Sequence, residues 1–313
     1  MATAETTPNQ TPLERHWREL VTRDEIDAWL AMEDWKSWAS IGLDWGIVFA
    51  SMALVAVWPN VFTVVAALFL IGARQLGLAV IMHEASHRSL FSNKKVNDWV
   101  GNWLGAYPVW SDLRPYRPYH LQHHAHTGTE KDPDLALTTP FPITRESFRR
   151  KVWRDLSGQT GWKFAKAAWK RTFGRFHDDP DARMAAIGFA TTNAVLLGIL
   201  TLAGHPALYL LWVGAWLTTN TLVTRIRAIA EHALTGDALE PQGRTRTVIP
   251  RWWERIFVAP NFVNYHIEHH LLASIPIYRL RDAHKRLVEL GYYDGIKVPN
   301  GYGEVLRDAT ATA

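Results

Sequence analysis

Four long apolar runs interrupt an otherwise polar chain of 313 residues. Each run is close to the roughly 20 residues that an α-helix needs to cross a bilayer. Residues 59–60 alone separate the first run from the second, and residues 204–206 alone separate the third from the fourth. Because such short connections join antiparallel helices, the pattern predicts two helical hairpins. The four runs cover residues 41–58, 61–82, 185–203 and 207–224.

The polar segments around these runs predict shorter elements. Residues 1–12 are expected to form a tail, and residues 13–37 a polar, partly amphipathic helix. Two stretches that mix Trp with apolar residues, 96–109 and 251–263, are expected to lie at the membrane surface as short helices. Residues 235–247 contain Gly and Pro and predict a loop. The predicted units are an N-terminal cytosolic tail and helix, a membrane domain and a C-terminal tail, over residues 1–37, 38–293 and 294–313.

The placement of charge favours membrane helices over the buried helices of a soluble all-α core. Of the 34 Lys and Arg residues, only Arg74 lies within an apolar run, and none lies in either short connection. The segment 88–183 between the hairpins is strongly basic, as the positive-inside rule expects for a cytoplasmic face. We therefore predict a protein of the inner or plasma membrane with both termini in the cytoplasm. Its basic segment is assigned to lipid head groups rather than to nucleic acid.

Arg74 is a separate candidate, because a charged residue within a spanning helix is costly and often functional. It could equally face a polar pocket between helices, paired with Asp44 or with a backbone carbonyl. The sequence leaves both interpretations open.

Three clusters of histidine follow the apolar runs. The chain has 14 His and no Cys, which excludes disulfides, iron–sulfur clusters held by thiolates and cysteine nucleophiles within it. The clusters have the spacing HxxxH once and HxxHH twice, and residues three or four apart share a helix face, so each cluster is expected to face one way. Imidazole suits borderline metals such as Fe, Zn and Cu, and eight nitrogens are too many for one ion, so two ions are predicted. The eight residues are His83, His87, His120, His123, His124, His266, His269 and His270.

Further residues extend this candidate site. His232 follows the fourth run and is a candidate ninth ligand, whereas His126 is expected to lie behind the ligands or at the surface. Ligating imidazoles usually donate their second N–H to a carboxylate or carbonyl. The candidate partners are Glu84, Glu231, Glu268, Asp132, Asp134 and Asn264, although the two aspartates would also fit a plain turn. The remaining histidines, expected to be ordinary, are His16, His177, His205 and His284.

All three clusters fall on the predicted cytosolic side of the membrane, so they can converge there. The predicted architecture is therefore an all-α integral membrane protein. It has four transmembrane helices in two hairpins and a cytosolic helical cap that carries the metal site.

The three clusters resemble, in order and in position relative to two hairpins, the histidine boxes of the membrane fatty acid desaturase family. The Asn264-Tyr265 pair and the segment from Arg227 to His232 are similar to flanking sequences of that family, and the resemblance covers roughly residues 35–293. It implies an oxidoreductase of lipid and fatty acid metabolism in which the eight histidines and His232 bind two Fe²⁺ ions. It also implies that molecular oxygen is a co-substrate and that a cis double bond enters a fatty acyl chain. The electron donor would be external: a ferredoxin, a cytochrome b5-type protein or a flavoprotein reductase.

Other functions use similar clusters. A di-iron hydroxylase or ketolase acting on a lipid or another apolar substrate is the nearest alternative, and it would leave oxygen in its product. A metal transporter would need ligands near the middle of the membrane, whereas these clusters follow the spans. A dinuclear zinc hydrolase would need no reductant.

Overall fold

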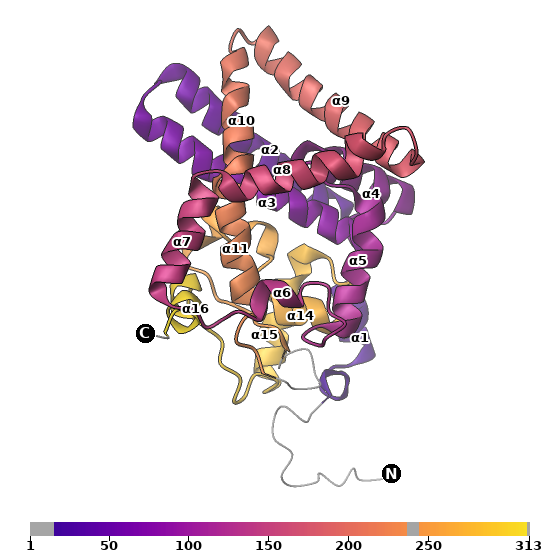
Figure 1. The fold of residues 1–313 in the computed structure, drawn as a ribbon. Helices are drawn as coiled ribbons and strands as arrows, with labels where there is room; N and C mark the ends of the chain where they lie inside the picture. Colours follow the sequence, from indigo (N-terminus) through magenta and orange to yellow (C-terminus); the bar gives the residue numbers. More distant parts are fainter. Residues whose placement is uncertain (1–15, 237–243, 312–313) are drawn as a thin grey trace, which may run out of the picture.

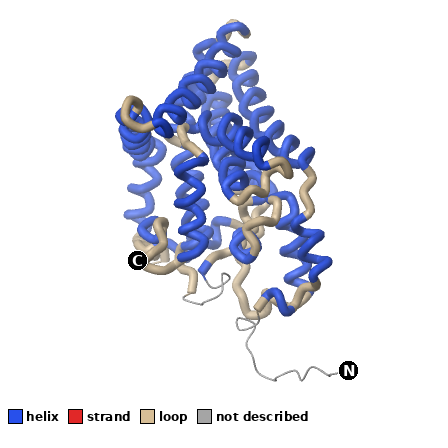
Figure 2. The backbone as a smooth tube through the Cα atoms, turned by 90° about the vertical axis from the view of Figure 1, so that its right-hand side faces the viewer, coloured by secondary structure: helices blue, strands red, loops and turns tan. Residues whose placement is uncertain are grey.

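The computed structural model describes residues 16–236 and 244–311. Helices make up most of these two ranges, and none of the residues within them forms a β-strand. Figure 2 shows the described chain passing from helix to helix through loops and turns. The predicted all-α class is confirmed for these residues. The predicted tail 1–12 and residues 237–243 of the predicted loop lie outside them.

Three helices are long and apolar enough to cross a membrane: α2 (Asp34–Val57), α3 (Val61–Ser86) and α9 (Pro180–Leu202). The first two form a hairpin (Figure 1). Its connection is closed by Asn60, whose side-chain oxygen accepts hydrogen bonds from the backbone N–H groups of the next helix at 3.0 and 3.1 Å. Such capping satisfies donors that the first helical turn leaves free. The first predicted hairpin is therefore present in the fold.

The fourth apolar run does not form one continuous helix, which corrects the prediction. It divides into α10 (Tyr209–Leu217) and α11 (Thr219–His232) at Thr218, whose φ of −122° and ψ of −86° are not helical. The Thr218 hydroxyl donates to the carbonyl of Gly214 at 2.6 Å, and the Thr219 hydroxyl donates to the carbonyl of Leu68 in α3 at 2.5 Å. Hydroxyls that bond to nearby backbone compete with helical hydrogen bonds. Figure 1 shows the two helices following one another end to end.

A close approach between α3 and α11 accompanies this break. A Cβ atom added at Gly72 would lie 2.2 Å from the Thr219 hydroxyl oxygen, so only glycine allows the two backbones this close. This contact holds the start of α11 directly against α3 of the first hairpin.

The second hairpin is open on one side. In Figure 1, α9 slants away from α10 below their shared connection, and α8 (Gln159–Thr172) crosses the gap between them. The three helices contact one another in pairs. In this view the three helices form the sides of a triangle, with α8 as its lower side.

The polar segments form short helices rather than long ones. The predicted helix over residues 13–37 is wrong as a single element. It divides into a turn at Trp17–Glu19, α1 (Arg23–Leu30) and the start of α2, because Thr22 and Glu25 build a capping box that begins a new helix. The stretches 96–109 and 251–263 do hold short helices, and their place at a membrane surface stays a prediction. The other helices are α4 (Lys94–Val100), α5 (Leu113–His126), α6 (Leu135–Thr138), α7 (Arg145–Leu156), α13 (Trp252–Phe257), α14 (His266–Leu271), α15 (Leu280–Glu289) and α16 (Tyr302–Ala309).

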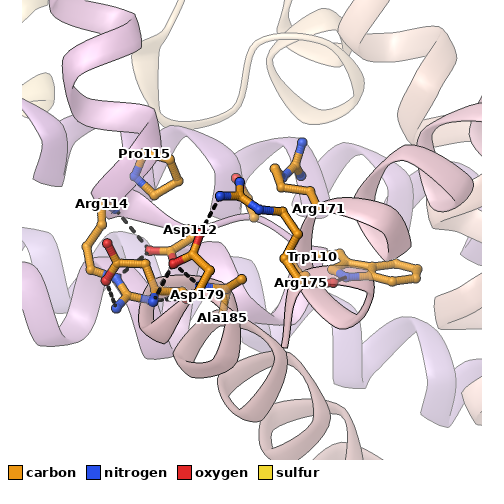
Figure 3. Close-up of a pocket in the computed structure, with 12 residues that line it drawn as sticks. Trp110, Asp112, Arg114, Pro115, Arg171, Arg175, Asp179 and Ala185 are labelled. Carbon is orange, nitrogen blue, oxygen red and sulfur yellow. Dashed lines mark hydrogen bonds and ion pairs between the residues drawn. The ribbon is translucent and has the colours of Figure 1, made fainter. Parts of the chain in front are cut away.

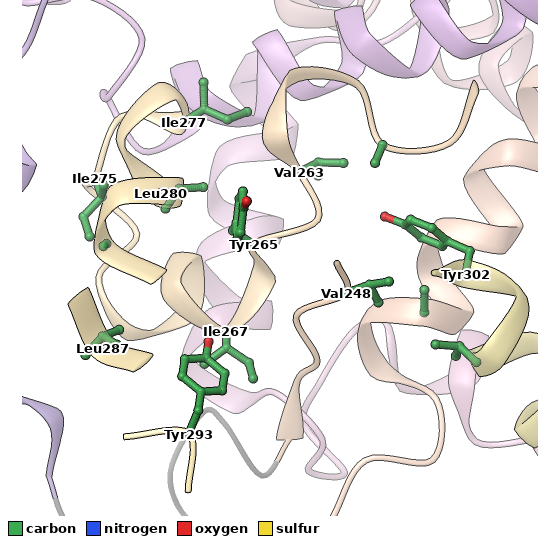
Figure 4. Packing of buried hydrophobic residues seen from close by; sticks show 14 of the residues in the cluster. Val248, Val263, Tyr265, Ile267, Ile275, Ile277, Leu280, Leu287, Tyr293 and Tyr302 are labelled. Atoms are coloured by element: carbon green, nitrogen blue, oxygen red, sulfur yellow. The ribbon is translucent and has the colours of Figure 1, made fainter. Parts of the chain in front are cut away.

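A hydrophobic core surrounds α14 and fixes its orientation. Figure 4 shows Tyr265 and Ile267, on either side of His266, turned into a cluster with Leu280 and Tyr293. Burying side chains of this size stabilises by about 1.5–3 kcal/mol each, so α14 is held firmly where it presents its histidines. The same core includes Trp29 and Val305 from the two ends of the described chain. The domain borders at residues 37 and 293 stay a prediction.

Candidate metal centre

Four helices bring nine histidines together. The end of α3 supplies the first cluster, α5 the second and α14 the third, while the end of α11 supplies His232. The histidines form two groups, within each of which all candidate ligand atoms lie within 4.8 Å of one another. Group A comprises His83, His87, His120, His124 and His269, and group B comprises His123, His232, His266 and His270.

Each HxxHH cluster is divided between the two groups, which corrects the expectation that it faces one way. His120 and His124 enter group A, but His123 enters group B. Adjacent residues on an α-helix are turned about 100° apart, so neighbouring histidines enter different groups. The groups nonetheless adjoin, because the rings of His124 and His270 stack with centroids 4.1 Å apart.

The spacing of nitrogens fits metal coordination. The Nε2 atom of His124 lies 3.0 Å from the Nε2 atoms of both His120 and His269. In group B, the Nε2 atom of His266 lies 2.8 Å from that of His232 and 3.1 Å from that of His270. Two imidazole nitrogens bound at right angles, each about 2.1 Å from a metal ion, are about 3.0 Å apart. Both groups therefore match the edges of a coordination polyhedron.

Two further nitrogens support the same conclusion. The Nε2 atoms of His83 and His87 are buried and have no hydrogen-bond partner among the described residues. A buried polar nitrogen without a partner is costly unless something binds it. The residues present thus fit a pair of first-row metal ions, with nitrogen donors that suit iron.

Burial lowers the pKa of several of these imidazoles. Together with the charges of neighbouring groups, it lowers the pKa of His124 to about 2 and the pKa of His232 to about 3. It also lowers the pKa of His266, His269 and His270 well below the usual value. Because a metal binds the neutral imidazole, the groups are prepared for metal at physiological pH.

Comparison with known proteins identifies the family. A family model described as fatty acid desaturase matches residues 56–299. The chain belongs to the fatty acid desaturase family. The resemblance of the three clusters is confirmed, and the protein is a desaturase-like oxidoreductase.

This chain has relatives that are named for different substrates. It is 32% identical over 242 residues to the dihydrorhizobitoxine desaturase of Bradyrhizobium elkanii, covering 72% of this chain and 68% of the relative. It is 27% identical over 271 residues to an sn-1 oleoyl-lipid 12-desaturase of a Picosynechococcus strain, covering 80% and 76%. A chloroplastic omega-6 fatty acid desaturase of Glycine max is 25% identical over 244 residues, covering 70% and 54%.

In this desaturase-family protein, Asp132 holds the second cluster. Its Oδ1 lies 2.8 Å from Nδ1 of His123, while its Oδ2 accepts from the backbone N–H of Gly128 at 2.8 Å. Asp134 is more distant, with 3.8 Å between its Oδ2 and the same Nδ1. The contact places Asp132 where it can orient the imidazole of His123, so this aspartate does more than form a turn, whereas a role for Asp134 stays a prediction.

Replacing Asp132 by asparagine is expected to lower iron affinity and activity by about 10–100-fold, the usual effect of losing such a partner. The amide would turn a donor towards the N–H of Gly128 and remove the negative charge beside His123. Iron titration of the purified protein measures the change. Asp134→Asn is the matched control and should have the smaller effect; equal affinities for Asp132→Asn and the wild type would contradict the assignment.

Two glutamates lie beside the groups as expected. Oε1 of Glu84 is 3.2 Å from Nδ1 of His83, and its Oε2 accepts from the backbone N–H of Ile277 at 3.1 Å. Oε2 of Glu231 is 3.7 Å from Nε2 of His266, and its Oε1 accepts from Arg227 at 2.6 Å. The Glu84 carboxylate thus ties His83 to the distant segment at Ile277, whereas Glu231 is paired with Arg227 and lies beyond hydrogen-bond distance of His266.

Glu268 and Asn264 have other partners than those expected. The Glu268 carboxylate accepts from the Thr247 hydroxyl at 2.7 Å, from Nδ1 of His284 at 2.6 Å and from the Tyr293 hydroxyl. The Asn264 amide donates to the carbonyl of Val248 at 3.0 Å. The three partners of Glu268 occupy its carboxylate on the side of the core, whereas Oδ1 of Asn264 is buried without a hydrogen-bond partner among the described residues, so a role of Asn264 beside the ligands stays a prediction.

Several residues next to the site were not predicted from the sequence. His284, expected to be ordinary, buttresses α14 through Glu268. The Thr127 hydroxyl lies 3.4 Å from Nδ1 of His270, and the backbone carbonyl of Arg244 lies 3.4 Å from Nδ1 of His232. Tyr116 stacks on His120 with centroids 5.2 Å apart and an angle of 10°. Of these, only Tyr116 could have been found from the sequence, because it stands four residues before His120 and residues at this spacing share a helix face.

Proposed function

We propose that this protein is an integral membrane enzyme that uses two iron ions and molecular oxygen to introduce a cis double bond into an acyl chain of a lipid. The observation that carries the proposal is the pair of adjoining, buried imidazole groups at the end of α3. Group A would hold one Fe²⁺ ion and group B the other. Bound iron would supply the oxidation of an unactivated C–H bond, which no side chain can perform.

The side chains themselves have three tasks in this proposal. The neutral imidazoles bind the metal ions, and Asp132 and Glu84 orient His123 and His83. Burial excludes water: His266 and His269 are each only 2% exposed. The proposed ligands and the carboxylates beside them therefore form one buried site from which bulk water is excluded.

The proposed membrane arrangement follows from the helices. We propose that α2, α3, α9 and the α10–α11 rod make four crossings in two hairpins, with the break at Thr218 near the cytoplasmic side. Phe62 and Leu202, close to the two connections, are 82% and 92% exposed, which suits contact with lipid or the far interface. The basic segment between α3 and α9 and both termini would lie in the cytoplasm with the cap and the metal site, at the inner or plasma membrane.

The reaction needs electrons from outside the chain. Desaturation removes two hydrogens from adjacent carbons, and reduction of one O₂ to two waters requires two further electrons and two protons. The chain has no Cys, so it holds no iron–sulfur centre of its own. We therefore propose an external donor, a ferredoxin, a cytochrome b5-type protein or a flavoprotein reductase.

The substrate proposal rests on the relatives. Two of them are named for acting on oleoyl lipids or fatty acids, which supports a membrane acyl lipid. Another is named for dihydrorhizobitoxine, which favours a second candidate, a small non-lipid substrate. A hydroxylase or ketolase is a further alternative that differs in product.

Mass spectrometry of total lipids decides among these candidates. The protein is expressed with a compatible reductase under ¹⁸O₂, with His123→Ala as the control. Lipids lighter by two hydrogens and free of ¹⁸O, only with the wild type, are the expected result. Incorporation of ¹⁸O would identify a hydroxylase or ketolase, and unchanged lipids despite bound iron would favour a non-lipid substrate.

A further inference from the structure

A group of polar side chains lies between the first hairpin and the segment that leads to α14. Asp44 of α2 is fully buried and Arg74 of α3 is 3% exposed, and Nη1 of Arg74 lies 3.2 Å from Oδ1 of Asp44. The Asp44 carboxylate also rests against Gly77 of α3, where an added Cβ would lie 2.6 Å from either carboxylate oxygen. Because only glycine leaves room for the carboxylate here, α2 and α3 fit closely around it.

The Asn261 side chain reaches this place from the turn between α13 and α14. Its Nδ2 donates to Oδ2 of Asp44 at 2.7 Å and to the carbonyl of Gly77 at 3.2 Å. The carboxylate and the carbonyl are both acceptors, so both N–H groups of the amide are used. Arg74 provides a second attachment, because its Nη2 donates to the carbonyl of Ile256 in α13. The segment from α13 to α14 is therefore fastened to the hairpin at two points.

The backbone of this turn is strained. Asn261 has a φ of 53° and a ψ of 37°, and the next residue, Phe262, has a φ of 57°. Left-handed backbone is tolerated by Asn but is unusual for a bulky side chain. Such residues cost free energy and persist only where surrounding contacts hold them. The hydrogen bonds of Asn261 to the hairpin are contacts of this kind.

The attachment lies close, along the chain, to two of the three histidine clusters. Gly77 stands six residues before His83 on α3. Asn261 stands five residues before His266, the first residue of α14. Group A needs both helices, since the ring centroids of His83 on α3 and His269 on α14 are 4.4 Å apart. A shift of α14 relative to α3 would therefore disturb group A.

The second cluster has an attachment of another kind. Nη2 of Arg114, at the start of α5, lies 2.6 Å from Oδ2 of Asp112, and its Nη1 lies 2.8 Å from Oδ1 of Asp181 in α9. Figure 3 shows Arg114 joined to carboxylates in this region. The Asp181 side chain is 71% exposed, and exposed ion pairs contribute little to stability. The buried attachment at Asp44 is therefore the stronger of the two.

We propose that Asn261 is a positioning residue for the metal centre: its two hydrogen bonds set the distance between α14 and α3, and so the geometry of group A. Apolar side chains can hold two segments together as stably as buried polar groups do, but their attraction has no direction. Hydrogen bonds to two fixed acceptors define distance and orientation together. The part of this inference that concerns metal rests on the proposed function.

Asn261→Gly tests the proposal, because it removes both hydrogen bonds and keeps a residue that accepts left-handed backbone. Hydrogen–deuterium exchange of the purified protein should become faster in residues 263–271. The affinity for Fe²⁺ is measured by dialysis of the iron-loaded protein against a graded chelator. It should fall by about tenfold or more, as when a partner of a metal ligand is lost.

Asn193→Ala is the matched control. The oxygen of this amide accepts from the Tyr209 hydroxyl at 3.0 Å and from the indole N–H of Trp212 at 3.2 Å, so it joins α9 to α10. Helix α9 supplies no histidine to either group. The control should lower the Tm in detergent without changing exchange in residues 263–271 or the affinity for Fe²⁺.

An exchange of the two partners tests the hydrogen bond itself. Asn261→Asp places a second carboxylate against Asp44 and should weaken Fe²⁺ binding. Adding Asp44→Asn restores an amide–carboxylate hydrogen bond with donor and acceptor exchanged, and it returns the net charge of the group to its original value. Part of the affinity for Fe²⁺ should therefore return in the double variant.

Unchanged exchange together with unchanged iron affinity in Asn261→Gly would overturn the proposal. Faster exchange with wild-type iron affinity would overturn the positioning role, as would an equal loss of affinity in Asn193→Ala at the same Tm. Wild-type protein without a pair of iron ions would contradict the proposed function instead, and the exchange measurement would still test the attachment of α14.

Discussion

Replacing His123 by alanine is expected to abolish product formation while the protein still inserts into the membrane. His123 supplies one of four imidazoles of group B, and its ring centroid lies 4.7 Å from that of His232. Removal of a ligand should cost more than the about 10–100-fold that loss of an outer partner costs. The double bonds formed per amount of membrane-inserted protein measure the effect.

His205→Ala is the matched control for this variant. His205 is exposed in the connection between α9 and α10 and belongs to neither histidine group. Its activity should equal that of the wild type. Full activity of His123→Ala would remove the second cluster from the proposed metal site.

Replacing Asp44 by alanine should destabilise the fold by about 3–5 kcal/mol, because it leaves the buried guanidinium of Arg74 without its counter-charge. Asp44 is fully buried and Arg74 is 3% exposed. Nη1 of Arg74 lies 3.2 Å from Oδ1 of Asp44, its Nη2 donates to the carbonyl of Ile256, and Asn261 donates to Oδ2 of Asp44 at 2.7 Å. Thermal unfolding in detergent measures the loss as a lower Tm.

The double variant Asp44→Leu with Arg74→Met separates charge from packing. Removing both members of a buried pair is often neutral, so most of the lost stability should return. An unchanged Tm for Asp44→Ala would show that the pair contributes nothing. The pairing of Arg74 with Asp44 and with a carbonyl, both considered from the sequence, is confirmed; a functional role for Arg74 stays untested.

Features that repeat along the chain were predictable from the sequence. The first hairpin and α9 could be predicted from the length of their apolar runs, and eight of the nine histidines from their spacing of three and four residues. His232 was a candidate only because it follows the fourth run. The division of each HxxHH cluster was also implicit in helix geometry, since His123 and His124 are adjacent and cannot point the same way. The structure shows which group each one joins.

Features that depend on contacts between distant segments were not predictable. The break at Thr218 accompanies a hydrogen bond from Thr219 to the carbonyl of Leu68 in α3, a contact between distant segments that the sequence does not show. Glu268 looked like a partner of the histidines because it stands between them, but the packing of α14 turns it to His284 and Tyr293. Such choices are made by tertiary packing, which overrides local pattern.

Iron content per polypeptide tests the central claim that two adjoining imidazole groups hold a pair of iron ions. The wild-type protein, purified under reducing conditions, is analysed by inductively coupled plasma mass spectrometry and by Mössbauer spectroscopy. Two iron ions per chain, close enough to couple and reduced in number in His123→Ala, are the predicted result. A single iron ion, or zinc in its place in the active protein, would contradict the account.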